Sequence, residues 1–454
     1  MSMSPVSVGF ASVNLMEILN QRRPTEMPVE VRAVFFRQDD RNSVYLVSDF
    51  MDFNLKVVDT LKAAVAKQLP ANTEIHIVTT HNHGGLTWQA FDMARYGELA
   101  AQCACQAMEG CRHAWMRVGQ AKLTRPLSMI RRIAIPELGG KLSCFFGIRE
   151  EENRNAAPFI EAALQEVRDG KGLSYKSRCE TTRPYQPFAP ADPDLDVLEF
   201  IAADDHSIMG RIVRFACHAN CCNRDDYISA DYPGYLRQML DSRRPGLTLF
   251  FNGPCAEIAP AIPGKSPESG KLLGGALAEL AMKALEALED SDCLPLNCFE
   301  DHLCPVELPV RQEVLDNHVE MPAEIPEDLP ARKRYLELKR LMGTMPFLRE
   351  KYTQGEAAPG KNIRISCALL RLNEVGLLFM PGETFNATGR AIQEAVPGTR
   401  LITVTEHGRT VMYLPPEEEF RQGGYEMTCA VTACGAEAVM RETLRKLVTG
   451  ILKK

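Results

Sequence analysis

The sequence predicts an α/β fold with a mixed, multi-stranded sheet core covered by helices. Three observations predict this class. Strand and helix patterns alternate near the N-terminus, as in a βαβ unit. Pairs of strand patterns around short turns recur further along the chain. The 454 residues are 45% hydrophobic and 24% charged, which supplies ample apolar material for a large core.

The first four elements form the alternating unit. Residues 43–50, SVYLVSDF, have the continuous apolar run of a buried strand. Residues 54–69 repeat apolar side chains at i, i+3 and i+4, which is typical of an amphipathic helix. The β-branched run EIHIVTT predicts the next strand, and residues 89–108 predict a second helix.

Later segments extend this pattern. Strand pairs are predicted at DVLEFIAA with GRIVRFAC and at ISCALLRL with VGLLFM, and single strands at LTLFFNG and LITVTE. Helices are predicted over residues 271–290, from about 384 to 394, and over residues 434–454. Residues 307–361 are richer in proline and charge, with a helical centre at ARKRYLELKRLM. That segment is either an inserted lid over a site or a surface excursion.

Composition excludes several classes of partner. The formal net charge is −7 without a basic block, whereas nucleic-acid binding needs clustered Lys and Arg. No window has the apolar length of a membrane span, and the first residues lack the pattern of a secretion signal. Fifteen cysteines without regular spacing predict buried or free thiols. We expect a cytoplasmic protein acting on a small molecule, either as a monomer or as a homo-oligomer.

Polar groups follow the ends of several predicted strands. The run VTT leads into His81 and His83, RFAC into His218, LFFN into Gly253, and LLFMPG into Glu383. In open α/β sheets, ligands bind at the carboxyl edge, because loops and helix N-termini converge there. Two histidines, a carboxylate and one further oxygen or nitrogen donor suit a zinc ion that keeps one position for water.

The His81 and His83 pair has a geometric reason. In an extended segment, side chains at i and i+2 point to the same side. Both imidazoles could therefore reach one metal, or one could bind the metal while the other faces a substrate. Taken alone, this pair favours a structural role, since many histidines cap turns.

An ordered set of motifs, from about residue 7 to about residue 426, resembles the neutral/alkaline non-lysosomal ceramidase family. The motifs are, in chain order, VGFASVNL, VYLVSDF, THNHGG, VRFACHAN, ISADYPGY, FFNGPCAEIAP, FMPGE and YLPPEEEFRQGGYE. The family consists of zinc-dependent amidases that cleave the N-acyl bond of ceramide. The resemblance implies a single catalytic domain over residues 1–454, with Zn²⁺ as its cofactor.

By position, the resemblance implies that His81, His218, Glu383 and Tyr413 bind the zinc ion. Such an ion lowers the pKa of bound water to about 7 and polarises a carbonyl group. Two alternatives stay open. Glu383 could instead cap the helix that begins near Thr384, and Tyr413 could be a packed aromatic side chain.

The resemblance also implies catalytic roles for His83, Tyr425 and Arg131. His83 and Tyr425 match family residues that face the scissile amide and stabilise the developing oxyanion. Arg131, in SMIRRI, lies near the position of a family arginine, and Arg132 is a competing candidate.

Residues near His218 admit two interpretations. Asp231 and Tyr232, in SADYPGY, either orient the imidazole of His218 or form a turn into a helix. Asn252 either shapes a substrate loop or ends a strand.

Two further histidines have no expected role at the metal. His76 is expected to pack in its strand, and the resemblance assigns no role to His407.

Three positions depart from the family pattern. The family element Gly-Asp-x-Ser-Pro is AEIAP here, with Glu257 for the aspartate and Ala259 for the serine. The family element His-x-His-Ser-Gly is HNHGG, with Gly84 for the serine. The chain is also expected to lack the family's C-terminal immunoglobulin-like domain. We therefore expect a zinc hydrolase that cleaves a C–N bond of a small soluble N-acyl substrate. The alternatives are a zinc esterase or lactonase and a non-catalytic binding protein that retains the fold.

Overall fold

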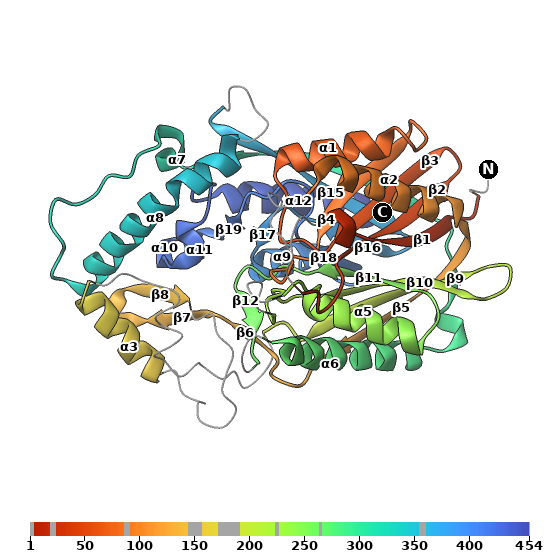
Figure 1. The fold of residues 1–454 in the computed structure, drawn as a ribbon, viewed down its shortest axis with the longest axis horizontal. Helices are drawn as coiled ribbons and strands as arrows, with labels where there is room; N and C mark the ends of the chain where they lie inside the picture. The colour runs from red at the N-terminus through yellow and green to blue at the C-terminus, as the bar shows by residue number, and fades with distance from the viewer. Residues whose placement is uncertain are drawn as a thin grey trace.

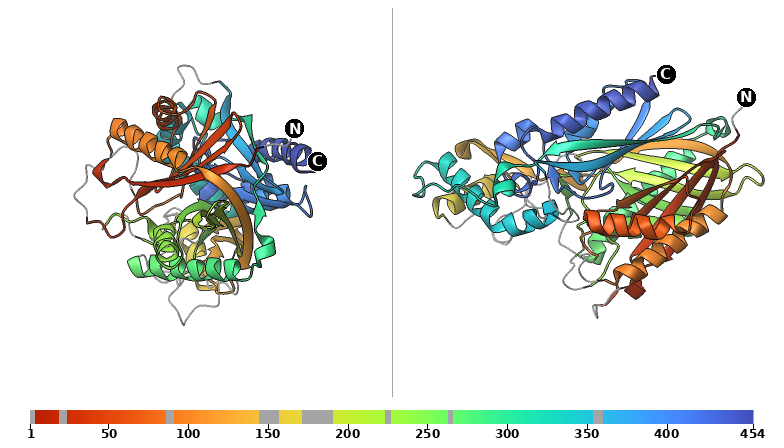
Figure 2. Two further views of the ribbon diagram at one scale, coloured as in Figure 1. Left: turned by 90° about the vertical axis from the view of Figure 1, so that its right-hand side faces the viewer. Right: turned by 90° about the horizontal axis from the view of Figure 1, so that it is seen from above.

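Two β-sheets pack face to face, and helices cover the outer face of each (Figures 1 and 2). This computed structural model describes residues 4–18, 24–85, 91–143, 157–170, 191–222, 227–262, 266–353 and 360–453. Within them, no helix is long and apolar enough to cross a membrane. The α/β class predicted from the sequence is confirmed. Its strands, however, divide between two sheets.

The larger sheet has the strand order β11-β10-β9-β5-β1-β2-β3-β4, with β13 paired to β5. Its strands are β1 (Ser7–Asn14), β2 (Glu30–Gln38), β3 (Arg41–Ser48), β4 (Thr73–Thr79), β5 (Arg112–Lys122), β9 (Asp194–Ala202), β10 (Ile208–Phe215), β11 (Leu247–Asn252) and β13 (Leu294–Pro295). The pairs β3 with β4 and β10 with β11 are parallel. Helices α1 (Leu55–Ala66) and α5 (Asp231–Arg243) make these two crossovers, as the βαβ prediction requires.

The smaller sheet has the order β14-β15-β16-β18. Its strands are β14 (Phe299–Pro309), β15 (Asn362–Leu372), β16 (Val375–Phe379) and β18 (Arg400–Val404). The first two pairs are antiparallel, and β16 runs parallel to β18 across helix α9 (Asn386–Gln393). The segment between the paired strands β14 and β15 holds helices α7 (Gln312–Asp316) and α8 (Leu329–Thr353). A lid role for it stays a prediction.

Both faces of the larger sheet are buried. Successive strand residues point to opposite faces, so β2 sends Ala33 and Phe35 toward the helices and Val34 and Phe36 toward the smaller sheet. Helices α1, α2 (Met93–Glu109), α5 and α6 (Pro267–Glu286) form the outer layer on that side. Helices α9 and α12 (Ala436–Leu452) cover the smaller sheet, and α8 packs in the same apolar cluster beyond the end of this sheet (Figure 1). Burial on both faces explains why these strands read as continuous apolar runs.

Short elements surround the ends of both sheets. They are η1 (Met16–Ile18), β6 (Ser128–Ile130), β7 (Arg132–Ile135), η3 (Pro136–Leu138), β8 (Gly140–Ser143), α3 (Ala157–Arg168), β12 (Ile258–Pro260), η4 (Asp290–Asp292), β17 (Glu383–Thr384), β19 (Tyr413–Leu414), α10 (Glu417–Gln422) and α11 (Tyr425–Thr428). Strands β7 and β8 with helices α3 and α8 enclose a separate small apolar cluster at one end of the molecule (Figure 1).

Most predicted elements form within a few residues of their expected bounds. Helix α1 begins after Asn54, whose side chain accepts a hydrogen bond from the N–H of Val57. The helix predicted over residues 89–108 is α2, although residues 86–90 lie outside the described part of the chain. Every cysteine that the structure describes is a free thiol, as expected.

Candidate metal centre

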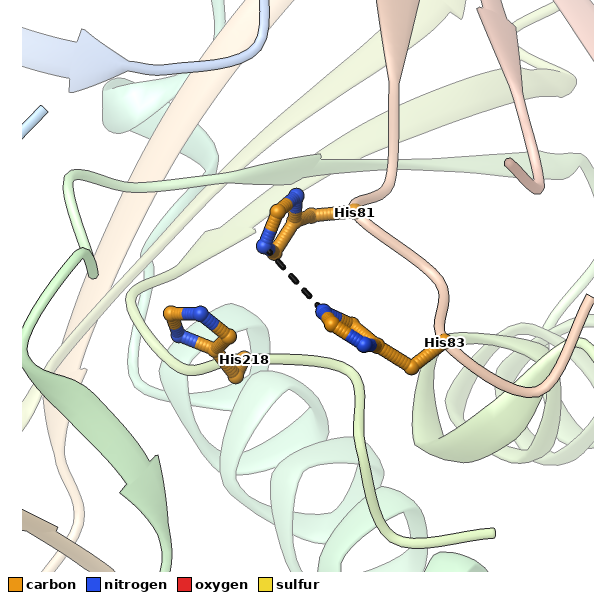
Figure 3. Close-up of side chains that lie close together, drawn as sticks. All are labelled: His81, His83 and His218. Atoms are coloured by element: carbon orange, nitrogen blue, oxygen red, sulfur yellow. Dashed lines mark hydrogen bonds between the residues drawn. The ribbon is translucent and has the colours of Figure 1, made fainter. Parts of the chain in front are cut away.

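Three imidazoles converge where strands of the larger sheet end. His81, His83 and His218 each place one ring nitrogen within 4.8 Å of the others (Figure 3). The ring centroids of His81 and His218 are 4.6 Å apart, and the Nε2 atoms of His81 and His83 are 3.3 Å apart. The two segments that the sequence analysis singled out therefore meet.

Asn252 holds these two segments together. Its side-chain amide donates to the carbonyls of Thr80 and Cys217, over 3.3 and 2.9 Å, and its carbonyl accepts the N–H of Cys217. Beyond it, Asn82 and Ala219 pair as an isolated bridge. Asn252 thus joins the loops that carry His81 and His218.

Glu383 reaches the same cluster from the smaller sheet. Its Oε2 atom is 3.1 Å from Nε2 of His218 and 3.5 Å from Nε2 of His81. The preceding Gly382 has φ +52°, and a Cβ there would lie 2.7 Å from the carbonyl oxygen of Met412. A glycine at this turn therefore lets the chain direct Glu383 inward.

The alternative role of Glu383 as a helix cap is wrong. Residues Glu383 and Thr384 pair as strand β17, and helix α9 begins only at Asn386. The backbone N–H of Asn386 donates to the carboxylate of Glu257, 3.1 Å from each oxygen. Glu257 therefore binds the start of α9.

Backbone carbonyls fix the imidazole of His218. Its Nδ1 atom is 2.9 Å from the carbonyl oxygens of both Cys255 and Ile258. A carbonyl can only accept, so Nδ1 carries the proton and Nε2 presents its lone pair to the cluster.

Of the two interpretations of Asp231 and Tyr232, the one in which they orient the imidazole of His218 is therefore wrong, and the turn into a helix is confirmed, since α5 begins at Asp231. Asp231 accepts the backbone N–H groups of Cys221 and Cys222 at 2.9 and 2.7 Å. The hydroxyl of Tyr232 donates to the carbonyl of Cys217. Both residues fix the backbone around His218 and leave its ring to other partners.

The imidazole of His81 has a carboxylate behind it. Its Nδ1 atom is 3.0 Å from the carbonyl oxygen of Met51 and 3.2 Å from Oε1 of Glu406. The sequence analysis missed Glu406. The available signal was its position at the end of LITVTE, because polar groups after strand ends identified the other site residues.

Arg131 and Tyr413 close the cluster on the side of Glu383. Pairing of β17 with β19 sets Tyr413 opposite Glu383. Arg131 donates from Nη2 to the hydroxyl of Tyr413 over 2.8 Å, and its Nη1 is 3.2 Å from Nε2 of His218. The ring of Tyr425 lies 5.7 Å from that of Tyr413.

Arg132, the competing candidate, binds two glutamates instead of a histidine of the cluster. It donates to Glu426 over 2.7 Å and to Glu419 over 2.8 Å. The described contacts therefore favour Arg131 as the arginine of the site. The opposite oxygen of the Glu426 carboxylate accepts Nε of Arg131, so one buried glutamate fixes both arginines.

Electrostatics separate the two central histidines. Burial lowers the pKa of His81, but Glu406 and Glu383 outweigh it and raise that pKa to about 9. Burial and the charge of Arg131 lower the pKa of His218 to about 4. Although burial alone would raise it, His81 and His218 hold the pKa of Glu383 well below its usual value. Burial raises the pKa of Glu406 to about 8, which the charge of His81 only partly opposes. Without a metal, His81 and Glu406 are thus the groups of this cluster that hold protons near neutral pH.

Three non-glycine residues around the site have left-handed backbone conformations. They are His81 at φ +57°, Glu406 at φ +60° and Met412 at φ +59°. Such conformations cost free energy and persist where surrounding contacts fix them. Their gathering here is typical of a functional site.

His76 and His407 form a separate polar network in the core. His76 contacts His407 over 3.0 Å and Asp301 over 2.8 Å, and its ring stacks on Tyr45. Nδ1 of His407 is 2.9 Å from the carbonyl oxygen of Ser366. His76 therefore does more than pack in its strand, and His407 belongs to this network rather than to the metal site.

Comparison with protein-family models and with the sequences of curated proteins gives no match. Among solved structures, the chain is similar to neutral ceramidase from Pseudomonas aeruginosa and to a ceramidase complexed with C2. Each comparison has a TM-score of 0.66 and 15% sequence identity, and covers 99% of this chain and 75% of the other. The chain therefore has the fold of a neutral-ceramidase-like catalytic domain, as its motifs implied.

Proposed function

From this neutral-ceramidase-like fold, we propose that the chain is a zinc-dependent hydrolase that cleaves the C–N bond of a small N-acyl substrate. The observation that carries the proposal is the convergence of His81, His218 and Glu383 from three distant segments. His83 adds a third imidazole to the same buried space.

The donors present fit a zinc ion. Imidazole nitrogens and a carboxylate oxygen are common zinc ligands. The second ring nitrogens of His81 and His218 both face acceptors, which is the arrangement that orients metal-binding histidines. We assign His81, His218, Glu383 and Tyr413 to the metal.

The remaining residues would act on the substrate. A bound zinc ion would polarise the substrate carbonyl and lower the pKa of water. His83 is the half-buried member of the imidazole cluster, so we assign it to the substrate side, where it donates a hydrogen bond to the oxyanion. Tyr425 donates a second one, and Arg131 holds the hydroxyl of Tyr413 in place.

A zinc esterase or lactonase is the second candidate. Ala259 stands where the family has a serine, and it packs in an apolar cluster with Met129 and Ala261. A hydroxyl that the family uses at the amide is therefore missing. Parallel assays on matched N-acyl and O-acyl substrates distinguish the two activities. Turnover of O-acyl substrates alone would reject the amidase, and a zinc-loaded protein inactive on both would favour a binding protein.

Metal analysis tests the central claim. We expect about one zinc per chain in the purified parent protein and strongly reduced zinc in His81→Ala and His218→Ala. His113→Ala is the matched control, because His113 is exposed and contacts Ser7 rather than the cluster. Undiminished zinc in both site variants would remove the proposal.

A further inference from the structure

We propose that Glu406 is a positioning residue for His81: its carboxyl group lies against the Nδ1 side of the imidazole, beside the carbonyl of Met51, so that Nε2 faces the metal. This inference rests on the proposed function. Glu406 lies outside the motifs that resemble the ceramidase family.

The two nitrogens of His81 have different surroundings. Oε1 of Glu406 is 3.2 Å from Nδ1. Nε2 of the same ring is 3.3 Å from Nε2 of His83 and 3.5 Å from Oε2 of Glu383. Because the ring nitrogens of an imidazole point apart, Glu406 contacts the side of His81 that faces away from the cluster. It is therefore placed behind a ligand rather than among the ligands.

The contact between His81 and Glu406 is buried, so water does not screen it. The side chains of His81 and Glu406 are each 2% exposed. Within the described residues, Oε1 of Glu406 makes no hydrogen bond, because the Nδ1–H of His81 is directed at the carbonyl of Met51. A buried carboxyl oxygen without a hydrogen bond is costly, and its contact with the imidazole of His81 offsets part of that cost.

The backbone fixes Glu406 between the segments that carry two proposed ligands. Its carbonyl accepts the N–H of Thr79, two residues before His81, over 3.2 Å. Its own N–H donates to the carbonyl of Gly382, directly before Glu383, over 3.4 Å. These bonds hold the left-handed φ of +60° at Glu406. The carboxylate is thereby set at a constant place relative to both ligands.

The two proposed histidine ligands are therefore supported differently. Backbone carbonyls of Cys255 and Ile258 face Nδ1 of His218, and they carry no net charge. The carbonyl of Met51 and the carboxyl group of Glu406 both face Nδ1 of His81, and a carboxylate partner raises the basicity of an imidazole toward a metal. We expect His81 to bind zinc more strongly because of Glu406.

Zinc affinity of folded variants tests this role. Glu406→Gln keeps the shape of the side chain and removes its charge. Glu406→Asn is the second variant, because asparagine adopts a left-handed backbone more readily and so favours the native turn. Zinc dissociation constants are measured at fixed pH by competition with a chromogenic chelator. We expect each variant to bind zinc about 10- to 100-fold more weakly than the parent.

Two comparisons separate positioning from a general structural effect. Glu257→Gln is the matched control, because Glu257 is also buried near the site but binds the backbone of Asn386. Its zinc affinity should stay within about threefold of the parent. In a His81→Ala background, Glu406→Gln should change zinc affinity by less than about threefold, because its partner ring is gone.

The outcomes are distinct. A parent protein that binds no zinc rejects the proposed function itself. A parent that binds zinc, with unchanged affinity in both Glu406 variants, rejects only the positioning role. An equal loss with and without His81 also rejects it, because Glu406 would then act on the fold in general.

Discussion

At the scale of single residues, the site depends on which atoms carry protons. His81 has a pKa of about 9, because Glu406 and Glu383 outweigh the effect of burial. In the metal-free protein this histidine is a cation at neutral pH. Binding of the proposed zinc ion would displace that proton, since a metal ligand needs a free lone pair.

Zinc affinity should therefore rise with pH. The folded pKa of His81 lies above the ordinary value of 6.5, so the bound proton stabilises the metal-free fold below about pH 6.5. This stabilisation is lost as the pH rises through about 9. We expect apparent affinity to increase about tenfold per pH unit between pH 7 and 9 and then level off. Chelator competition across this range checks it, and a flat profile would contradict it.

A second prediction at this scale concerns Gly253, which packs closely against the side chain of Arg214. A Cβ at this position would lie 2.4 Å from the guanidinium of Arg214, which is buried against Asp192 and the carbonyl of Thr403. Gly253→Ala should destabilise the protein by about 1–3 kcal/mol, because Arg214 must move. Urea unfolding measures the change. Gly343→Ala is the control: Gly343 lies within helix α8 with nothing within 4 Å, so alanine there should be neutral or stabilising.

At the scale of elements, helix α8 is fixed to the loop beside the site. Its Lys351 donates to Asp52 over 2.7 Å, and both side chains are buried. Asp52 follows Met51, whose carbonyl faces Nδ1 of His81. The segment between β14 and β15 thus binds Asp52, the residue next to the one whose carbonyl contacts the proposed ligand His81.

Breaking this ion pair should cost much of the stability of the fold. Lys351→Met leaves Asp52 buried without its cation, which costs about 3–5 kcal/mol. The double variant Lys351→Met with Asp52→Leu removes both charges and should recover most of that loss. Denaturant unfolding of the three proteins checks the prediction. A loss below about 1 kcal/mol in the single variant would show that Asp52 finds another partner.

The elements themselves were largely predictable. Apolar runs and helical spacing located α1, β4, β15 and β16, because local periodicity reflects burial on one face or both. The start of α9 was placed too early, since the pairing of Glu383 with Tyr413 depends on a segment thirty residues away. The division into two sheets was not predictable for the same reason: strand pairing is decided by contacts between distant segments.

At the scale of the whole molecule, buried carboxylates make the free energy of unfolding depend on pH. Burial raises the pKa of Glu426, but Arg132 and Arg131 lower it to about 2. The pKa of Asp301 is likewise lowered, because His76 outweighs burial. Groups with lowered pKa values stabilise the folded state above their unfolded pKa and lose this effect as the pH falls.

The protein should therefore lose stability in acid. For Glu426, the stabilisation is present above about pH 4.5 and disappears as the pH falls toward 2, and it amounts to roughly 3 kcal/mol. Unfolding free energies from pH 7 to pH 2 measure it. Glu426→Gln should be less stable at pH 7 and show a shallower decline. An unchanged slope would contradict the assignment to Glu426.

Much of the candidate site could be read from the sequence, because ligands after strand ends carry a local signal. His81, His218, Glu383 and Arg131 were selected in this way or by resemblance, and the fold brings them together. Glu406 and the carbonyl partners of His218 were not foreseen. Their roles depend on which backbone passes behind each ring, and that follows only from the packing of two sheets.

The distribution of the site along the chain has a consequence for biogenesis. The proposed metal ligands come from residues 81, 218, 383 and 413, so neither half of the polypeptide contains the complete proposed set. If this set binds the proposed ion, a nascent chain on the ribosome completes the site only after the last of these segments has emerged and docked. Completion of the proposed metal site would then follow folding, and a truncated translation product would lack part of the ligand set.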